Sequence, residues 1–162
     1  MTSSIASITP ADLDDIVVMA GELSLHEGDP VPDVSASDLA EVMFSSHPLL
    51  FGSIAHVDQM PAGYALWTVG YTMQYGKSLL EIVDLYVRPD VRRKGIGRAL
   101  MRTMAHVAQG RGYRFLTVKT FNGNAEANAF YRACGGMLDQ TNVYGFGLKA
   151  MAGLRSEACD DL

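Results

Sequence analysis

The feature that most constrains the fold is an apolar run that leads through a basic loop into a helix opened by two glycines. Residues 79–87 are predicted to form a strand and residues 88–94 a charged loop, and Gly95 and Gly97 open a helix that ends near Gly110. The first turn of a helix leaves about four backbone N–H groups unpaired and carries partial positive charge. Glycine lets a ligand approach these groups closely. The segment therefore predicts a site for a phosphate or pyrophosphate group.

Two common phosphate-binding loops do not fit this segment. A dinucleotide-binding fingerprint needs a third glycine or alanine, and that position holds Leu100. A Walker loop has its lysine after the glycines, whereas Lys94 precedes Gly95. The alternative is an ordinary strand–loop–helix connection with a solvated basic loop. The three consecutive cations from Arg92 to Lys94 favour the anion site.

The other segments predict an α/β (α+β) fold with a mixed, mostly antiparallel central sheet flanked by about four helices. Before the basic loop we expect a strand at Ser4–Ile8, a helix from the Thr9 cap to about His26, a helix from Ser35 or Ser37 to about Phe44, and strands at Leu50–Val57 and Gly63–Tyr71. After it we expect a strand at Arg114–Thr120, a helix at Ala125–Cys134, and strands at Met137–Tyr144 and Gly145–Lys149. Residues 1–150 would form a single domain, and residues 151–162 a tail.

Composition narrows the class of protein. The chain has no uncharged apolar run near the ~20 residues that span a bilayer. Met1–Pro10 lacks the basic and apolar regions of a secretory signal. Two cysteines, Cys134 and Cys159, are too few for a disulfide framework or a cysteine-rich metal site. We expect a cytoplasmic protein with no membrane partner and no metal.

Charge is distributed unevenly along the chain. Residues 1–76 contain ten Asp or Glu and no Lys or Arg, whereas all thirteen Lys and Arg lie between Lys77 and Arg155. An acidic half and a basic half suggest two different ligands, and the alternative is a solvated surface of uneven composition. The basic cluster lacks interleaved aromatic residues, which disfavours a nucleic-acid partner.

A second polar element follows the basic loop. Asn124 can cap a helix on which Asn128 and Tyr131 share one face. With the first element, it resembles the GNAT superfamily of N-acetyltransferases. The two signatures are Arg92-x-x-Gly95-x-Gly97, similar to the acetyl-CoA signature, and Asn124-x-x-Ala127-x-x-Phe130-Tyr131-x-x-x-Gly135. The resemblance covers residues 79–136 and implies a GNAT-like fold and direct transfer of acetyl from acetyl-CoA to a primary amine.

A closer resemblance is to the spermidine/spermine (diamine) acetyltransferase subfamily. It rests on Gly21-Glu22-Leu23-x-x-x-Glu27, Ser46-His47-Pro48-Leu49, Val83-Asp84-Leu85-Tyr86-Val87 and the glycine motif. It implies a small cationic amine (diamine, polyamine or lysine-like), and a homodimer is consistent with it. The open alternatives are another amine, such as a protein N-terminus, lysine or aminoglycoside, and a non-catalytic acyl-CoA sensor.

The resemblance also implies roles for individual residues. Tyr131 would face the sulfur, and Asn124 with its helix would contact the cofactor. The full set of implied cofactor-binding residues is Leu85, Tyr86, Val87, Arg92, Arg93, Lys94, Gly95, Ile96, Gly97, Arg98, Asn124, Ala127 and Tyr131.

An alkyl ammonium, with a pKa near ~10.4, must lose a proton before it attacks, so a carboxylate base is expected. Asp84 is the first candidate and Glu81 the second, and strand alternation places them on opposite faces unless a bulge intervenes. The diamine subfamily has a glutamate where this chain has Val83, which leaves the base open. Asp84 and Tyr131 are the predicted catalytic residues. Glu27 and Asp84 are the predicted amine-binding residues, and Asp29 and Asp33 follow in the same loop.

Overall fold

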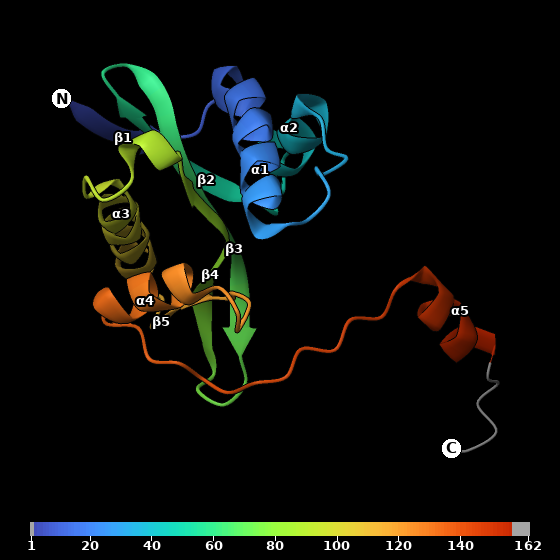
Figure 1. Cartoon of the computed structure of the whole chain (residues 1–162). Helices are drawn as coiled ribbons and strands as arrows, with labels where there is room; N and C mark the ends of the chain where they lie inside the picture. Colours follow the sequence, from blue (N-terminus) through green and yellow to red (C-terminus); the bar gives the residue numbers. More distant parts are fainter. Residues whose placement is uncertain (1, 157–162) are drawn as a thin grey trace.

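The computed structural model describes residues 2–156, which contain five strands and five α-helices (Figure 1). The strands are β1 (Ser3–Ser7), β2 (Phe51–Val57), β3 (Met60–Thr72), β4 (Lys77–Val87) and β5 (Phe115–Val118). They pair in the order β1-β2-β3-β4-β5, antiparallel except for the parallel pair β4–β5. The helices are α1 (Leu13–Glu27), α2 (Ala36–Phe44), α3 (Ile96–Gly110), α4 (Ala125–Ala133) and α5 (Leu148–Ser156). The predicted fold class is confirmed.

Local capping explains where the first two helices begin and end. Thr9 donates from its backbone N–H and its hydroxyl to Asp12 Oδ2, and a short 3-10 turn at Pro10–Asp12 precedes α1. Ser35, not Ser37, caps α2, because its Oγ accepts from the Asp38 backbone N–H at 3.2 Å. Gly28, with a φ of 82°, adopts the left-handed conformation that ends α1.

The sheet separates two apolar layers, and each strand sends alternate side chains to each. Helices α1 and α2 cover one face, where Ile16 and Met19 meet Ile54, Tyr64 and Tyr86. Helix α3 covers the other face of the sheet. There Leu100 and Met104 of α3 share one apolar layer with residues of β2, β3 and β4: Ala55, Ala65, Trp67, Leu80 and Ile82. Tyr64 is therefore a core residue, and its hydroxyl lies within reach of Asp84 on β4.

A β-bulge interrupts β4 at Val83. Leu66 is opposite Asp84 and Trp67 is opposite Ile82, so Val83 is the extra residue. The parallel ladder between β4 and β5 stops at Ile82, directly before the bulge. From Asp84 to Val87, β4 is paired with β3 alone. The sheet therefore opens between β4 and the chain that follows β5.

The predictions for the C-terminal part were wrong. Residues 136–147 form no helix or strand where two strands were predicted, and α5 begins at Leu148, inside the second of them. Alternating apolar side chains favour a strand, but a strand forms only beside a partner, and none lies alongside this segment. Figure 1 shows the segment leading away from the sheet to α5. Cys134 is a free cysteine, and Cys159 lies outside the described residues.

None of the described helices combines the length and the apolar character needed to cross a membrane.

Candidate functional site

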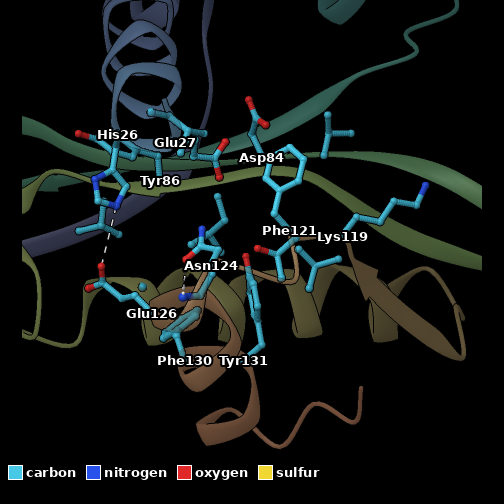
Figure 2. A pocket seen from close by; sticks show the side chains of 18 of the residues that line it. His26, Glu27, Asp84, Tyr86, Lys119, Phe121, Asn124, Glu126, Phe130 and Tyr131 are labelled. Carbon is cyan, nitrogen blue, oxygen red and sulfur yellow. Dashed lines mark hydrogen bonds and ion pairs between the residues drawn. The ribbon is translucent and has the colours of Figure 1, made fainter. Parts of the chain in front are cut away.

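A cavity of about 1110 Å³ occupies the opening between β4 and the turn that follows β5 (Figure 2). Its walls come from the end of α1, residues 83–87 of β4, the loop before α3, the start of α4 and residues 141–143. Of the residues predicted as catalytic, cofactor-binding or amine-binding, all but two line it: Glu27, Asp84, Leu85, Tyr86, Val87, Arg92, Arg93, Gly95, Gly97, Arg98, Asn124, Ala127 and Tyr131.

The two predicted residues outside this lining are Lys94 and Ile96. Lys94 Nζ donates to the Asp90 carbonyl oxygen at 3.0 Å, which fixes its own loop. The Ile96 side chain is 4% exposed and packs in the α3 core layer. Its predicted contribution to a ligand is therefore limited to its backbone N–H.

The part of the cavity wall formed by the start of α3 and the loop before it suits an anion. Arg92, Arg93 and Arg98 line it, and α3 begins at Gly95 with no side chain capping its first N–H groups. Gly95 has a φ of 85°, a conformation that costs other residues roughly 1–2 kcal/mol. A Cβ on Gly97 would lie 3.2 Å from the Phe130 ring, so this glycine lets α3 and α4 pack closely.

Arg92 also ties together three segments around the cavity. Its Nε donates to the Val87 carbonyl oxygen at 2.9 Å, and its Nη1 lies 3.5 Å from Glu126 Oε2. His26 Nε2 at the end of α1 lies 3.9 Å from the same carboxylate oxygen. These contacts hold the ends of α1 and β4 beside the start of α4.

The free edge of β4 forms the middle of the cavity. Leu85, Tyr86 and Val87 line it, and the Tyr86 ring is buried on the α1 side of the sheet. Tyr86 therefore offers the cavity mainly its backbone N–H and carbonyl groups. Because β5 stops pairing at Ile82, this edge can pair with an extended ligand that carries amide groups.

The acidic side chains of Glu27, Asp29 and Asp84 also line the cavity. The buried Tyr64 hydroxyl donates to Asp84 Oδ2 at 3.3 Å. Burial raises the pKa of Asp84, and the Tyr64 hydrogen bond opposes part of that rise. Burial, followed by the charges of Asp84 and Asp29, raises the pKa of Glu27, whose side chain stays largely in solvent. Asp29 lines the cavity, whereas Asp33 does not.

Tyr131 rises from α4 into the cavity, with Glu27 and Asp84 on the opposite wall (Figure 2). Burial, with smaller contributions from Cys134, Glu27 and Asp84, raises the pKa of its phenol to about 12. The hydroxyl therefore stays protonated at neutral pH and can donate a hydrogen bond into the cavity.

Other predicted residues have structural roles. Asn124 Oδ1 accepts from the Ala127 backbone N–H at 3.0 Å, which confirms the predicted cap. Asn128 Nδ2 donates to the carbonyl oxygens of Phe121 and Asn124, so it fixes the turn and does not line the cavity. Glu81 bonds to Lys119 and lies outside the lining despite the bulge.

Sequence analysis missed Tyr64, His26 and Glu126. Tyr64 sits in an apolar strand and carries no local signal of its role. Within residues 2–156, no group of three or more His, Cys, Asp or Glu side chains could hold a metal ion.

Comparison with known proteins identifies the architecture. The profile of the acetyltransferase (GNAT) family matches residues 22–136. A thialysine N-epsilon-acetyltransferase of Caenorhabditis elegans is 28% identical over 127 residues, which are 78% of this chain and 78% of the relative. An integron cassette protein from the mobile metagenome of V. cholerae has a TM-score of 0.79 at 25% identity, covering 96% of this chain and 99% of its own. AAC(6')-Iy in complex with the bisubstrate analog CoA-S-monomethyl-acetylneamine shares the fold, with a TM-score of 0.75 at 17% identity over 90% of this chain and 97% of its own.

Proposed function

The chain belongs to the acetyltransferase (GNAT) family, and we propose that it transfers the acetyl group of acetyl-CoA directly to a primary amine on a small cationic substrate. The observation that carries the proposal is that a single cavity is lined by both cationic and acidic groups. Arginines and the N-terminus of α3 contribute positive charge to its lining, and Glu27, Asp29 and Asp84 contribute acidic side chains. A cleft concentrates a ligand of opposite charge, so this arrangement suits an anionic donor and a cationic acceptor. The name of the C. elegans relative supports a lysine-like amine.

The residues around the cavity fit acetyl-CoA as a co-substrate. The N–H groups at the start of α3, with Arg93 and Arg98, would hold its pyrophosphate. The free backbone of Leu85 to Val87 would pair with the amides of its pantetheine arm. A backbone N–H near Leu85 would stabilise the charge that develops on the thioester oxygen.

Asp84 is the proposed general base. It is the only carboxylate that residues 77–87 of β4 contribute to the cavity, because Val83 occupies the neighbouring position and Glu81 lies outside. Its raised pKa makes it a better proton acceptor than an ordinary aspartate. Tyr131 would donate a hydrogen bond to the sulfur as the thiolate leaves.

Thiol release tests the proposal directly. The protein is incubated with acetyl-CoA and a diamine, lysine, thialysine, an aminoglycoside or a peptide N-terminus, and free thiol is followed. Release with cationic small amines supports the proposal. Saturable acetyl-CoA binding without release with any amine would instead indicate a non-catalytic sensor. A cytoplasmic location and the absence of nucleic-acid and membrane partners stay predictions.

Glu27→Gln is expected to raise the KM for a diamine about fivefold, because an exposed ion pair contributes up to about 1 kcal/mol. The KM for the diamine should also rise with salt in the parent enzyme, since the Debye length shortens from ~10 Å at 0.1 M to ~3 Å at 1 M. Asp33→Asn is the matched control, because Asp33 lies in the same loop outside the cavity. If Glu27→Gln leaves the KM for the diamine unchanged, or if neutral amines are better acceptors than diamines, the proposal of a cationic substrate is wrong. The proposal of acetyl transfer to an amine is not affected by that result.

Tyr64→Phe is expected to raise by about one unit the pKa that limits kcat/KM at low pH. This shift corresponds to about 1.4 kcal/mol, which is the scale of one hydrogen bond. The hydrogen bond lowers the pKa of Asp84, so its loss raises that pKa further, and a protonated Asp84 cannot accept a proton. As the pH falls, the variant should lose activity at a higher pH than the parent enzyme does. At pH values above this transition, kcat/KM should equal that of the parent. An unmoved acid limb would show that Tyr64 does not position Asp84 for the reaction.

A further inference from the structure

A second cavity, here called the distal cavity, has a volume of about 400 Å³, and none of its described lining residues lines the first cavity. It lies at the β1 edge of the sheet, where β2 extends beyond β1, because Ser7 at the end of β1 pairs with Ser53 and β2 begins at Phe51. The ends of α2 and α3 complete its wall. Small-molecule sites have volumes of about 300–1,000 Å³. The distal cavity is therefore of a size that suits a small molecule.

Arg111, directly after α3, brings a positive charge to the distal cavity. Its guanidinium lies over the rings of Trp67 and Phe51, with its central carbon 4.7 Å and 4.9 Å from the ring centroids. These contacts use the face of the guanidinium, whereas its N–H groups lie at the edge. Within residues 2–156, no carboxylate forms an ion pair with Arg111 and no oxygen accepts a hydrogen bond from its guanidinium. Arg111 is therefore held in place by the rings and keeps its donors for an anion.

Ser53 adds a buried polar group to the same lining. It is 4% exposed and lies on the same face of β2 as Phe51, two residues before it. Its hydroxyl makes no hydrogen bond to any other residue of the described chain, 2–156. Buried polar groups are normally hydrogen-bonded, so this hydroxyl marks a position for a polar atom of a ligand.

Much of the remaining lining is aliphatic or thioether, from Ile8, Met43, Leu50 and Val107. The rings of Phe51 and Trp67 already stack on each other, with centroids 4.4 Å apart, and carry the guanidinium. The lining therefore suits an alkyl chain better than a flat ring.

We propose that the distal cavity binds a medium-chain aliphatic carboxylate. The carboxylate accepts hydrogen bonds from the Arg111 guanidinium and the Ser53 hydroxyl, and the alkyl chain packs against the aliphatic side chains. A few placed polar groups in a mainly apolar cavity are the usual composition of a small-molecule site. This site is separate from the one proposed for acetyl transfer, and its occupancy does not depend on that reaction.

Fluorescence of the full chain tests the proposal with octanoate, kept below the concentration at which it forms micelles. Trp67 is the only tryptophan of the chain and lies under Arg111, so its emission reports binding at this cavity. A saturable change is expected. Octanamide, which has the same chain length and no charge, is expected to bind about tenfold more weakly, because hydrogen bonds to a charged acceptor are roughly twice as strong as neutral ones.

Calorimetry measures the variants, because loss of Arg111 also alters the surroundings of Trp67. Arg111→Gln is expected to raise the dissociation constant for octanoate about tenfold, and Ser53→Ala about threefold, since a charged pair contributes more than a neutral hydroxyl. Arg102→Gln is the matched control, because Arg102 is an exposed arginine of α3 outside the lining, and it should leave binding unchanged.

Three results would overturn the proposal: no saturable response to octanoate, equal affinity for octanamide, or Arg111→Gln binding octanoate as tightly as Arg102→Gln does. Displacement of octanoate by saturating acetyl-CoA would also overturn it, because the ligand would then occupy the first cavity. The comparison of octanoate with octanamide uses the parent protein alone, so it decides the matter even if a variant fails to fold.

Discussion

Replacing Asp84 with asparagine is expected to lower kcat/KM for the amine by about a thousandfold, within the ~10²–10⁴ that a general base contributes. An amide cannot take the proton that the ammonium must lose. Its carbonyl oxygen can still accept from Tyr64, so the local geometry is kept. The KM for acetyl-CoA should stay unchanged, since the side chain of Asp84 bonds to Tyr64 and not to the arginines proposed to hold the pyrophosphate. Initial rates of thiol release at saturating acetyl-CoA measure the effect.

Glu81→Gln is the matched control for this variant, because Glu81 is on the same strand but does not line the cavity. Stability supplies a second control. A carboxylate whose folded pKa is raised costs folding free energy at pH values above that pKa. Asp84→Asn should therefore not lower the Tm at pH 7, and any gain should vanish on acidification. A rate within tenfold of the parent would contradict the assignment of Asp84 as base.

Tyr131→Phe is expected to lower kcat by about a hundredfold, the lower end of the ~10²–10³ measured for loss of one transition-state donor. With its pKa raised to about 12, Tyr131 is a poor acid toward a thiolate. If the thiol has a pKa near ~8.5, full proton transfer is uphill by about 3.5 pH units, or about 5 kcal/mol. The phenol is therefore expected to act as a hydrogen-bond donor, and the KM for acetyl-CoA should change little.

The pH dependence separates these two roles for Tyr131. A donor with a pKa of about 12 stays neutral throughout the usual assay range, so it should produce no alkaline limb below pH 11. An alkaline limb that disappears in Tyr131→Phe would show that the phenol itself titrates during turnover. Tyr75→Phe, which removes a hydroxyl outside the cavity, serves as the control and should keep full activity. Full activity in Tyr131→Phe would remove Tyr131 from the chemistry.

The parts of the site that sequence analysis predicted depend on local geometry. Gly95 has the positive backbone angle that a glycine at the start of a helix readily adopts. Asn124 caps its own helix, because its side-chain oxygen accepts from the backbone N–H of Ala127, three residues further along the chain. Such features need no knowledge of the sheet, so spacing along the chain was enough to predict them.

The parts that were missed depend on register and on distant segments. The Tyr64–Asp84 hydrogen bond joins residues 20 positions apart, and it exists because the bulge at Val83 sets which side chains of β3 and β4 share a face. The contact between Arg92 and Glu126 requires that the loop before α3 lie beside the start of α4. The prediction of two strands within residues 137–149 was wrong for the opposite reason: the local pattern favours a strand, but strand formation depends on a partner that local sequence does not specify.

The bulge at Val83 has an evolutionary consequence. An extra residue in a strand carries no share of the regular pairing, so its side chain can change without disturbing the ladder on either side. Val83 is 51% exposed and faces the cavity, whereas its neighbour Ile82 is sealed in the core. Exchanging Val83 for an acidic, basic or bulky residue would alter the charge or width of the acceptor end at little cost to folding. The fold thus leaves one position on the wall of the cavity free to diverge, so substrate preference can drift among descendants of one ancestor while their sheet stays the same.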